Sequence, residues 1–338
     1  MNARVFTPTQ AVRSQVPLLL GIAGPPGSGK SYSALMLATG IKQHRGGDIF
    51  VIDTESNRAL AYAPKKGEKA DGIRTFDFVH VPFAPPFPPD DFLAAIRQLV
   101  AHKPACIIVD SASDEHEGEG GVLELHEQYI NDKAGNDWSK RDAYSQAGWN
   151  FAKAGRKRLI NAMLQTMTPV IFCFRAREKV KPIKNDRGKS VPTNIGWTPI
   201  APAEVVHSMT AFCLLPIRSD GVPMWKGNTA YEDFSIKMPV QFQGIFPEGK
   251  ALDASMGYAM SVWAMGDGTA TDVMQKSKQI KPEKSPIDIY AVELGQMLLK
   301  PDELALWWAN TGERRLALNI PEDREAKMRL AVDKVLNP

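Results

Sequence analysis

The segment Gly24-Pro25-Pro26-Gly27-Ser28-Gly29-Lys30-Ser31 satisfies the pattern G-x-x-x-x-G-K-[ST] in full. It follows an apolar run ending at Ala23 and precedes a helical pattern that begins at 34–37. This is the context that a phosphate-binding loop requires, because the glycines let backbone N–H groups turn onto the phosphates and the following helix adds its positive end. We therefore expect ATP and Mg²⁺ as cofactors, with Gly24 to Tyr32 contacting the nucleotide, Lys30 supplying a positive charge and the Ser31 hydroxyl binding the metal.

Around this loop, short apolar runs alternate with longer helical patterns from about residue 16 to 216. Such alternation is typical of a mainly parallel sheet flanked by helices, so the sequence predicts an α/β fold of the P-loop NTPase class. The predicted strands are 17–23, 48–53, 76–81, 105–110, 169–174 and 210–217, and the predicted helices are 31–43, 90–102 with Asp90 as N-cap, and 150–167. The stretch 83–89 holds four prolines and predicts a loop.

The chain is expected to contain two domains. Residues 1–264 form the predicted ATPase domain, and the Gly-, Ser- and Lys-rich stretch 265–286 is predicted to be a linker. Residues 287–338 carry three short amphipathic patterns, at 287–299, 301–311 and 321–336, which predict a small C-terminal helical domain.

Two further carboxylate positions fit nucleotide chemistry. The apolar run 105–109 ends in Asp110, which is expected to lie beside the magnesium ion bound by Ser31. Asp53 and Glu55 stand at the end of another predicted strand, at the sheet edge where ligands of open α/β folds bind. Either could face the γ-phosphate and orient the attacking water, and Glu55 is the preferred candidate.

Three segments together resemble the core strands of RecA-type recombinase ATPases: Ile49-Phe50-Val51-Ile52-Asp53-Thr54-Glu55, Ile108-Val109-Asp110-Ser111 and Ile171-Phe172-Cys173-Phe174-Arg175-Ala176-Arg177. The resemblance covers about residues 16–216. It looks closest to the short RecA-like (AAA/RecA-like) ATPases of bacteriophages found beside single-strand annealing and recombination genes, and the segment 144–149 is also similar to them.

This resemblance implies roles for individual residues. Glu55 would activate the water, Asp110 and Ser111 would close the magnesium site, and Arg175 would stand where the family senses the γ-phosphate. The family usually has glutamine at that position, so the arginine is a departure; it could contact phosphate directly or pair with an acid. The resemblance also implies DNA-linked ATP hydrolysis and a site completed between subunits of a homo-oligomer, either a ring or a filament.

A basic stretch follows Arg175. Seven basic residues stand against two acidic ones between 175 and 190, in a stretch that also contains proline, glycine and asparagine. We expect a mobile basic loop that binds single-stranded DNA phosphates, although a solvated loop or a subunit contact would have the same composition. The candidate DNA-binding residues are Arg177, Lys179, Lys181, Lys184, Arg187 and Lys189; Lys153, Arg156, Lys157 and Arg158 form a second basic cluster on a predicted helix.

The segment 111–127 has the opposite charge, with six acidic residues and no lysine or arginine. It predicts a flexible acidic loop. His116 and His126 could bind a metal together with these acids, but their spacing does not match that of zinc ligands, so a metal site is the minor hypothesis.

The bulk composition fits an ordinary globular protein. The chain has 338 residues, of which 43% are hydrophobic and 23% charged, and a net charge of +3 that gives no argument for or against nucleic acid. Its apolar run at 16–23 is too short to cross a bilayer, and no signal peptide is recognisable. Cys106, Cys173 and Cys213 lie in apolar runs without CxxC spacing, so we expect a cytoplasmic protein, in a bacterial host cell if a phage encodes it.

Three functions remain open from the sequence. The first is a DNA-dependent ATPase assisting recombination or strand annealing, with an annealing or single-strand-binding protein as a further partner. The second is a P-loop phosphotransferase with Arg175 and Arg177 as lid residues. The third is an ATP-driven loader or assembly protein whose helical tail holds another protein.

Overall fold

The computed structural model describes residues 6–135, 137–184, 188–227, 236–267 and 286–336. The chain separates into two compact units, Met1–Lys278 and Gln279–Pro338. Residues 268–285 of the predicted linker lie outside the described residues, so the domain boundaries inferred from the sequence stay a prediction.

The larger unit is built on one sheet with strand order β3-β2-β4-β5-β1-β7, and β6 pairs with β5 beyond this path. All neighbours on the path are parallel, which confirms the predicted α/β fold class. The strands are β1 (Leu19–Gly24), β2 (Ile49–Asp53), β3 (Val79–Pro82), β4 (Cys106–Asp110), β5 (Val170–Lys184), β6 (Ser190–Pro199) and β7 (Ala211–Leu214).

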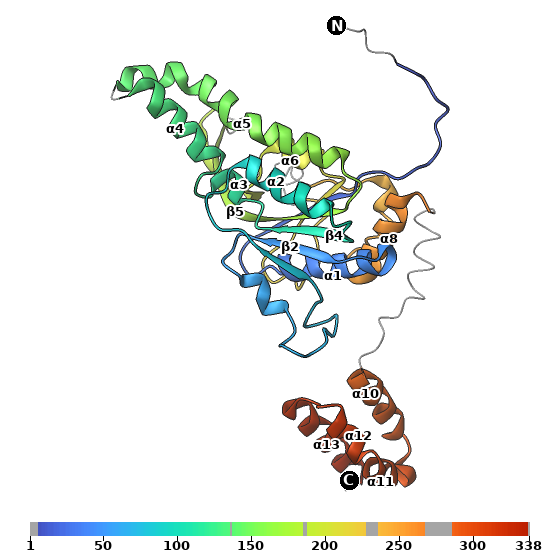
Figure 1. The fold of residues 1–338 in the computed structure, drawn as a ribbon. Coiled ribbons are helices and arrows are strands. Elements are labelled where there is room, and N and C mark those ends of the chain that lie inside the picture. Colours follow the sequence, from blue (N-terminus) through green and yellow to red (C-terminus); the bar gives the residue numbers. More distant parts are fainter. Residues whose placement is uncertain (1–5, 136, 185–187, 228–235, 268–285, 337–338) are drawn as a thin grey trace. The chain divides into compact units, whose positions relative to one another are not determined.

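Helices cover both faces of this sheet (Figure 1), which is why β1, β2 and β4 are buried along their whole length and read as continuous apolar runs. One face packs against α1 (Lys30–Arg45) and α8 (Ala254–Met265). The opposite face packs against α2 (Pro89–Val100), α5 (Arg141–Gln165) and α6 (Ala203–Ser208). The remaining elements of this unit are η1 (Arg58–Tyr62), α3 (Asp114–Glu117), α4 (Val122–Ala134), η2 (Trp138–Lys140) and η3 (Val240–Phe242).

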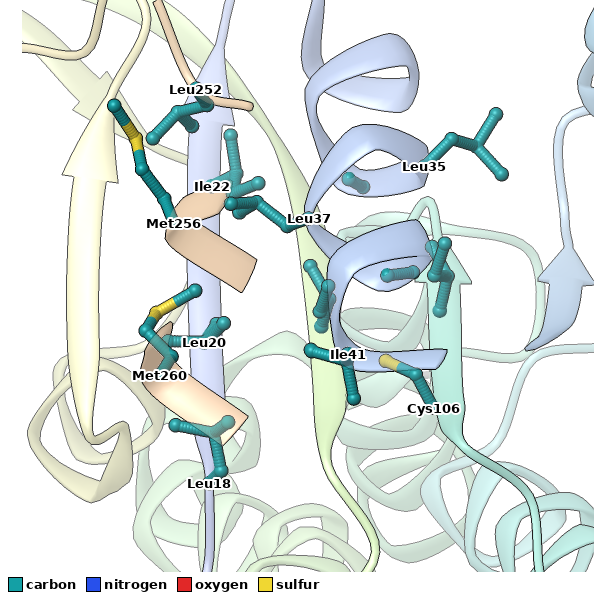
Figure 2. Close-up of a cluster of buried hydrophobic side chains, with 14 of the residues drawn as sticks. Leu18, Leu20, Ile22, Leu35, Leu37, Ile41, Cys106, Leu252, Met256 and Met260 are labelled. Atoms are coloured by element: carbon teal, nitrogen blue, oxygen red, sulfur yellow. The ribbon is translucent and has the colours of Figure 1, made fainter. Parts of the chain in front are cut away.

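Helix α8, which the sequence did not predict, fixes the position of α1. Figure 2 shows Met256 and Met260 of α8 beside Leu18 and the β1 residues Leu20 and Ile22, with Leu37 and Ile41 of α1 in the same cluster. The two helix backbones approach closely at Gly40, where an added Cβ would lie 1.8 Å from the Ala254 carbonyl oxygen. This packing holds the helix that follows the phosphate-binding loop.

Some predicted boundaries were wrong. The N-cap of α2 is Pro88, and Asp90 lies inside the first turn, where its carboxylate accepts hydrogen bonds from Arg158 at 3.0 and 2.6 Å. Helix α5 begins nine residues before the predicted start at 150. Its first turns extend beyond the sheet alongside α4 and lack the apolar spacing that marks a core-facing helix.

The smaller unit is helical and has its own core. It contains α10 (Pro286–Met297), α11 (Pro301–Asn310), α12 (Gly312–Ala317) and α13 (Glu322–Leu336), and α12 was not predicted. Tyr290, Leu294, Leu304 and Val332 are buried at its centre. Among the described residues of the whole chain, no helix is long and apolar enough to cross a membrane.

Candidate nucleotide site

The phosphate-binding loop joins the end of β1 to the start of α1. Gly27 and Gly29 have φ values of 73° and 88°, a region that favours glycine. A Cβ added at Gly24 would lie 2.4 Å from the Ser28 Oγ and 2.6 Å from the Leu215 carbonyl oxygen. The backbone path therefore favours glycine at all three positions, of which the motif itself requires Gly24 and Gly29.

The loop has the electrostatic character of an anion site. The first turn of α1 contains no acidic residue, and no side chain of the described residues caps it at Gly29. Its leading N–H groups have no partner within the helix and carry the positive end of the helix dipole. Lys30 Nζ donates to the Pro25 carbonyl oxygen at 3.0 Å, and Ser28 Oγ is buried without a hydrogen-bond partner among the described residues. The donors present here fit a nucleotide phosphate.

Tyr32 is the last residue of the predicted nucleotide-binding segment. Its side chain is half-buried and packs against Phe76 with a ring-centroid distance of 5.6 Å. The ring thus contributes to the core under α1, and its contact with a nucleotide stays a prediction.

Ser31 and Asp110 meet at the carboxyl edge of the sheet. Ser31 Oγ donates to Asp110 Oδ2 at 2.5 Å. Burial raises the pKa of the Asp110 carboxyl to about 6; the Ser31 hydrogen bond and the Lys30 charge act in the opposite direction, while the charges of Glu55 and Asp53 raise it further. A buried carboxylate and a hydroxyl in contact provide the oxygen ligands that Mg²⁺ prefers.

The candidate metal site is small. Among the described residues there is no group of three or more histidine, cysteine or acidic side chains that could hold a metal ion. Magnesium in nucleotide sites usually takes one or two side chains and completes its shell with water and substrate phosphates. The Ser31–Asp110 pair fits this type of site, and its role as the metal site stays a prediction.

The two carboxylates after β2 have different surroundings. Asp53 is buried, and its carboxylate accepts from the Glu55 N–H at 2.8 Å and the Ala59 N–H at 3.0 Å, with His80 Nε2 at 3.1 Å. The Glu55 side chain is 25% exposed and its Oε2 lies 3.5 Å from Arg58. Since Asp53 is already held by the turn that follows it, Glu55 is the carboxylate available to a water molecule.

Arg175 pairs with acids. Its guanidinium forms an ion pair with Asp114 and lies 3.5 Å from Glu117 Oε1, and its backbone N–H donates to Ser113 Oγ at 2.9 Å. The sequence left two possibilities for Arg175, contact with phosphate or pairing with an acid. In the structure Arg175 pairs with an acid. The predicted catalytic role of Arg175 stays a prediction.

The sequence did not indicate that Asp114 and Thr54 belong to the contacts around the candidate site. Thr54 Oγ1 donates to Asp114 Oδ2 at 2.6 Å, so Asp114 connects the residue beside Glu55 to Arg175. The prediction of a flexible acidic loop at 111–127 was wrong, because this segment forms α3 and the start of α4. An acid such as Asp114 can be buried here since Arg175 and Thr54 satisfy its oxygens.

Neither histidine of this segment belongs to a metal cluster within the described residues. Desolvation lowers the pKa of His116 to about 4, with the Arg156 charge as a second cause. His126 stacks on Trp149 with ring centroids 3.9 Å apart. The contacts of His116 and His126 are therefore those of residues that stabilise the fold.

The prediction that the basic stretch after Arg175 forms a mobile loop was also wrong. Strand β5 continues through Lys184 and pairs antiparallel with β6, in a register that ends at Lys184↔Ser190. We call β5 from Arg175 onward, β6, and the described residues 188–189 that precede β6 the basic hairpin. Its length was missed because charged residues interrupt β5 beyond Phe174 and β6 consists mostly of small polar residues, proline and glycine, so no regular apolar alternation marks either strand. Arg177, Lys179, Lys181, Lys184 and Lys189 are exposed on it, and Arg187 lies outside the described residues.

The second basic cluster does not form one surface. Arg156 is buried, and its Nε and Nη2 donate to Glu115 at 2.9 and 2.7 Å. Arg158 is paired with Asp90, as described above, and only Lys153 and Lys157 remain as exposed lysines. The helix α5 therefore offers fewer charges to a nucleic acid than its sequence indicates.

Comparisons with known proteins add little to this geometry. No protein-family model and no curated protein matches the chain. Among solved structures, the chain is similar to the crystal structure of the RadB recombinase, with a TM-score of 0.31 and 16% sequence identity over 60% of this chain and 76% of RadB. This likeness is too distant to support a function, so the proposals below rest on the described contacts.

Proposed function

We propose that this chain is a magnesium-dependent, RecA-like ATPase that acts on single-stranded DNA in recombination or strand annealing of the bacteriophage type. The observation that carries the proposal is the hydrogen bond between Ser31 and Asp110. It joins the phosphate-binding loop to the carboxylate of β4 in a single site. Strand β5 lies between β1 and β4 and leads directly from this site into the basic hairpin.

In the proposed site, the loop from Gly24 to Tyr32 holds the phosphates and Lys30 neutralises their charge. Ser31 and Asp110 hold magnesium, which when bound stabilises the charge that develops on the phosphates. Glu55 accepts a hydrogen bond from the attacking water and orients it. Arg175 keeps Asp114 and the segment after β4 in place. We include it in the catalytic group because its backbone pairs with Gly24, the first residue of the loop.

The basic hairpin is the proposed DNA contact. Its exposed basic residues lie along β5, with Lys189 just before β6, and a strand that projects into solvent can present such a row of charges to the phosphates of single-stranded DNA. The proposed partners are therefore single-stranded DNA, further copies of this chain and an annealing or single-strand-binding protein. The phosphotransferase alternative is weaker, because its lid candidates Arg175 and Arg177 both lie near Glu117.

The decisive experiment is ATP hydrolysis by the full chain with and without single-stranded DNA, with Lys30→Ala and Glu55→Gln as variants. We expect DNA to stimulate the wild type and each variant to lose at least about 100-fold in turnover, as for the loss of one group that stabilises the transition state. Glu55→Gln should still bind ATP, since it leaves the loop intact.

Two other results would favour one of the alternative functions. Hydrolysis that is indifferent to DNA at low salt would refute the DNA role and favour the loader hypothesis, which a deletion of residues 265–338 then tests. ADP formed only when a phosphate acceptor is added would identify a phosphotransferase.

A further inference from the structure

A cavity lies in the part of the chain that follows β7, and two of its lining residues, Ser219 and Val222, belong to the turn that borders the phosphate-binding loop. Leu215 N donates to the Ala23 carbonyl oxygen at 2.7 Å, and the next residues turn back toward α1. There the backbone nitrogen of Gly221 lies 3.8 Å from the position that a Cβ on Gly29 would take. The segment from Leu215 to Gly221 therefore borders both ends of the loop.

The cavity has a volume of about 740 Å³. This is within the range of small-molecule sites, roughly 300–1,000 Å³. Its walls include Val222, Met224, Trp225, Met238 and Phe246, all of which belong to the same compact unit as the loop.

The lining chemistry fits a planar heterocycle. Trp225 and Phe246 pack with ring centroids 4.5 Å apart, and the thioethers of Met224 and Met238 add polarisable surface. Gln243 and Glu248 also line the cavity and provide an amide and a carboxylate. Apolar walls with a few polar groups are the usual composition of a site that holds an aromatic ligand in one orientation.

We propose that this cavity holds the nucleobase of the nucleoside triphosphate whose phosphates lie on the Gly24–Ser31 loop. The inference rests on the proposed function and extends it, because it assigns base recognition to described residues within 216–226 and 238–249. The base lies between the loop after β7 and the turn that contains Phe246, and Gln243 and Glu248 contact its polar edge. Nothing in the phosphate-binding motif itself distinguishes one base from another.

The test compares binding of ATP with binding of inorganic tripolyphosphate, which has the phosphates and lacks the base. Calorimetry with magnesium present measures both ligands on the full chain. Val222→Trp fills the cavity from a half-buried wall position, and the matched control is Val240→Trp, a residue 75% exposed and outside the cavity lining. Gln243→Ala is a second variant, at an exposed position that cannot unfold the core.

We expect Val222→Trp to weaken ATP binding about 10-fold or more, the size of one lost base-stacking contact, with tripolyphosphate affinity within twofold of the wild type. Gln243→Ala should weaken ATP binding about threefold, and Val240→Trp should change neither ligand. Unchanged ATP binding in both cavity variants, or an equal loss of both ligands, would overturn the inference. A wild type that binds neither ligand would instead refute the proposed function itself.

Discussion

Replacing Asp110 by asparagine should make the protein more stable at neutral pH and remove its ATP hydrolysis. Burial raises the pKa of this carboxyl from 3.8 to about 6, so the charged form is disfavoured in the folded state. A difference of about 2 pKa units at 1.36 kcal/mol each corresponds to about 3 kcal/mol of folding free energy lost at pH 7. Asparagine keeps an oxygen that accepts the Ser31 hydrogen bond without carrying this charge.

The raised pKa of Asp110 also determines how the stability of the wild type changes with pH. Because the folded state holds the Asp110 proton more tightly than the unfolded state, the wild type loses stability as pH rises from about 3.8 to about 6. Below that window the carboxyl is neutral in both states, so wild type and Asp110→Asn should have nearly equal stability. Above it, the variant should be more stable by the full amount.

Denaturant unfolding of both proteins between pH 4 and pH 8, with a chelator present, measures this difference directly. The exposed Asp132→Asn is the matched control and should change stability by less than about 0.5 kcal/mol. A variant that is equally stable as the wild type at pH 7, or less stable, would refute the reasoning. The same variant should show no turnover, because an amide is a much weaker magnesium ligand than a carboxylate.

Three further outcomes follow from the contacts. Gly40→Ala should destabilise the protein by about 2–3 kcal/mol in thermal unfolding, because its Cβ would meet the α8 backbone; a stability equal to the wild type would contradict the close approach. Arg156→Met should cost about 3–5 kcal/mol by leaving Glu115 buried and unpaired, and Arg156→Met with Glu115→Leu should recover most of it; no recovery would show that the pair is not the cause. Removing four hairpin charges should reduce the slope of log affinity for single-stranded DNA against log salt by about 3, whereas removing four other exposed lysines should leave the slope unchanged. The hairpin set is Lys179, Lys181, Lys184 and Lys189, and the control set is Lys65, Lys66, Lys69 and Lys157, all changed to alanine.

The fold class was predictable because its signals are local. The apolar runs before Gly24 and before Asp110 correspond to β1 and β4 within one or two residues. Parallel strands that are buried on both faces can be recognised from their own sequence alone, because nearly all of their positions are apolar. The loop from Gly24 to Ser31 is likewise a contiguous motif.

The contacts of Arg175 were not predictable in the same way. Its partner Asp114 stands 61 residues earlier, in a run of acids that by composition resembles a solvated loop. Only the strand order, which places β5 beside β4, brings the two side chains together. The basic hairpin was missed for a related reason: its strands pair through backbone hydrogen bonds, and a ribbon exposed to solvent needs no apolar pattern.

The register of the sheet explains why the candidate site and the basic hairpin share residues. Gly24 of β1 pairs with Arg175 of β5, and Asp110 of β4 pairs with Cys173 of β5, so β1 and β4 end on either side of β5 at one edge of the sheet. Strands β1 and β4 stop there, and β5 alone continues outward and pairs with β6. Arg175 is thus the last residue of the central ladder and the first of the hairpin, and its ion pair with Asp114 holds the segment that also bonds to Thr54. A ligand on the phosphate-binding loop would therefore lie beside the middle of β5, near Arg175, and a ligand on the hairpin would contact the outer part of the same strand.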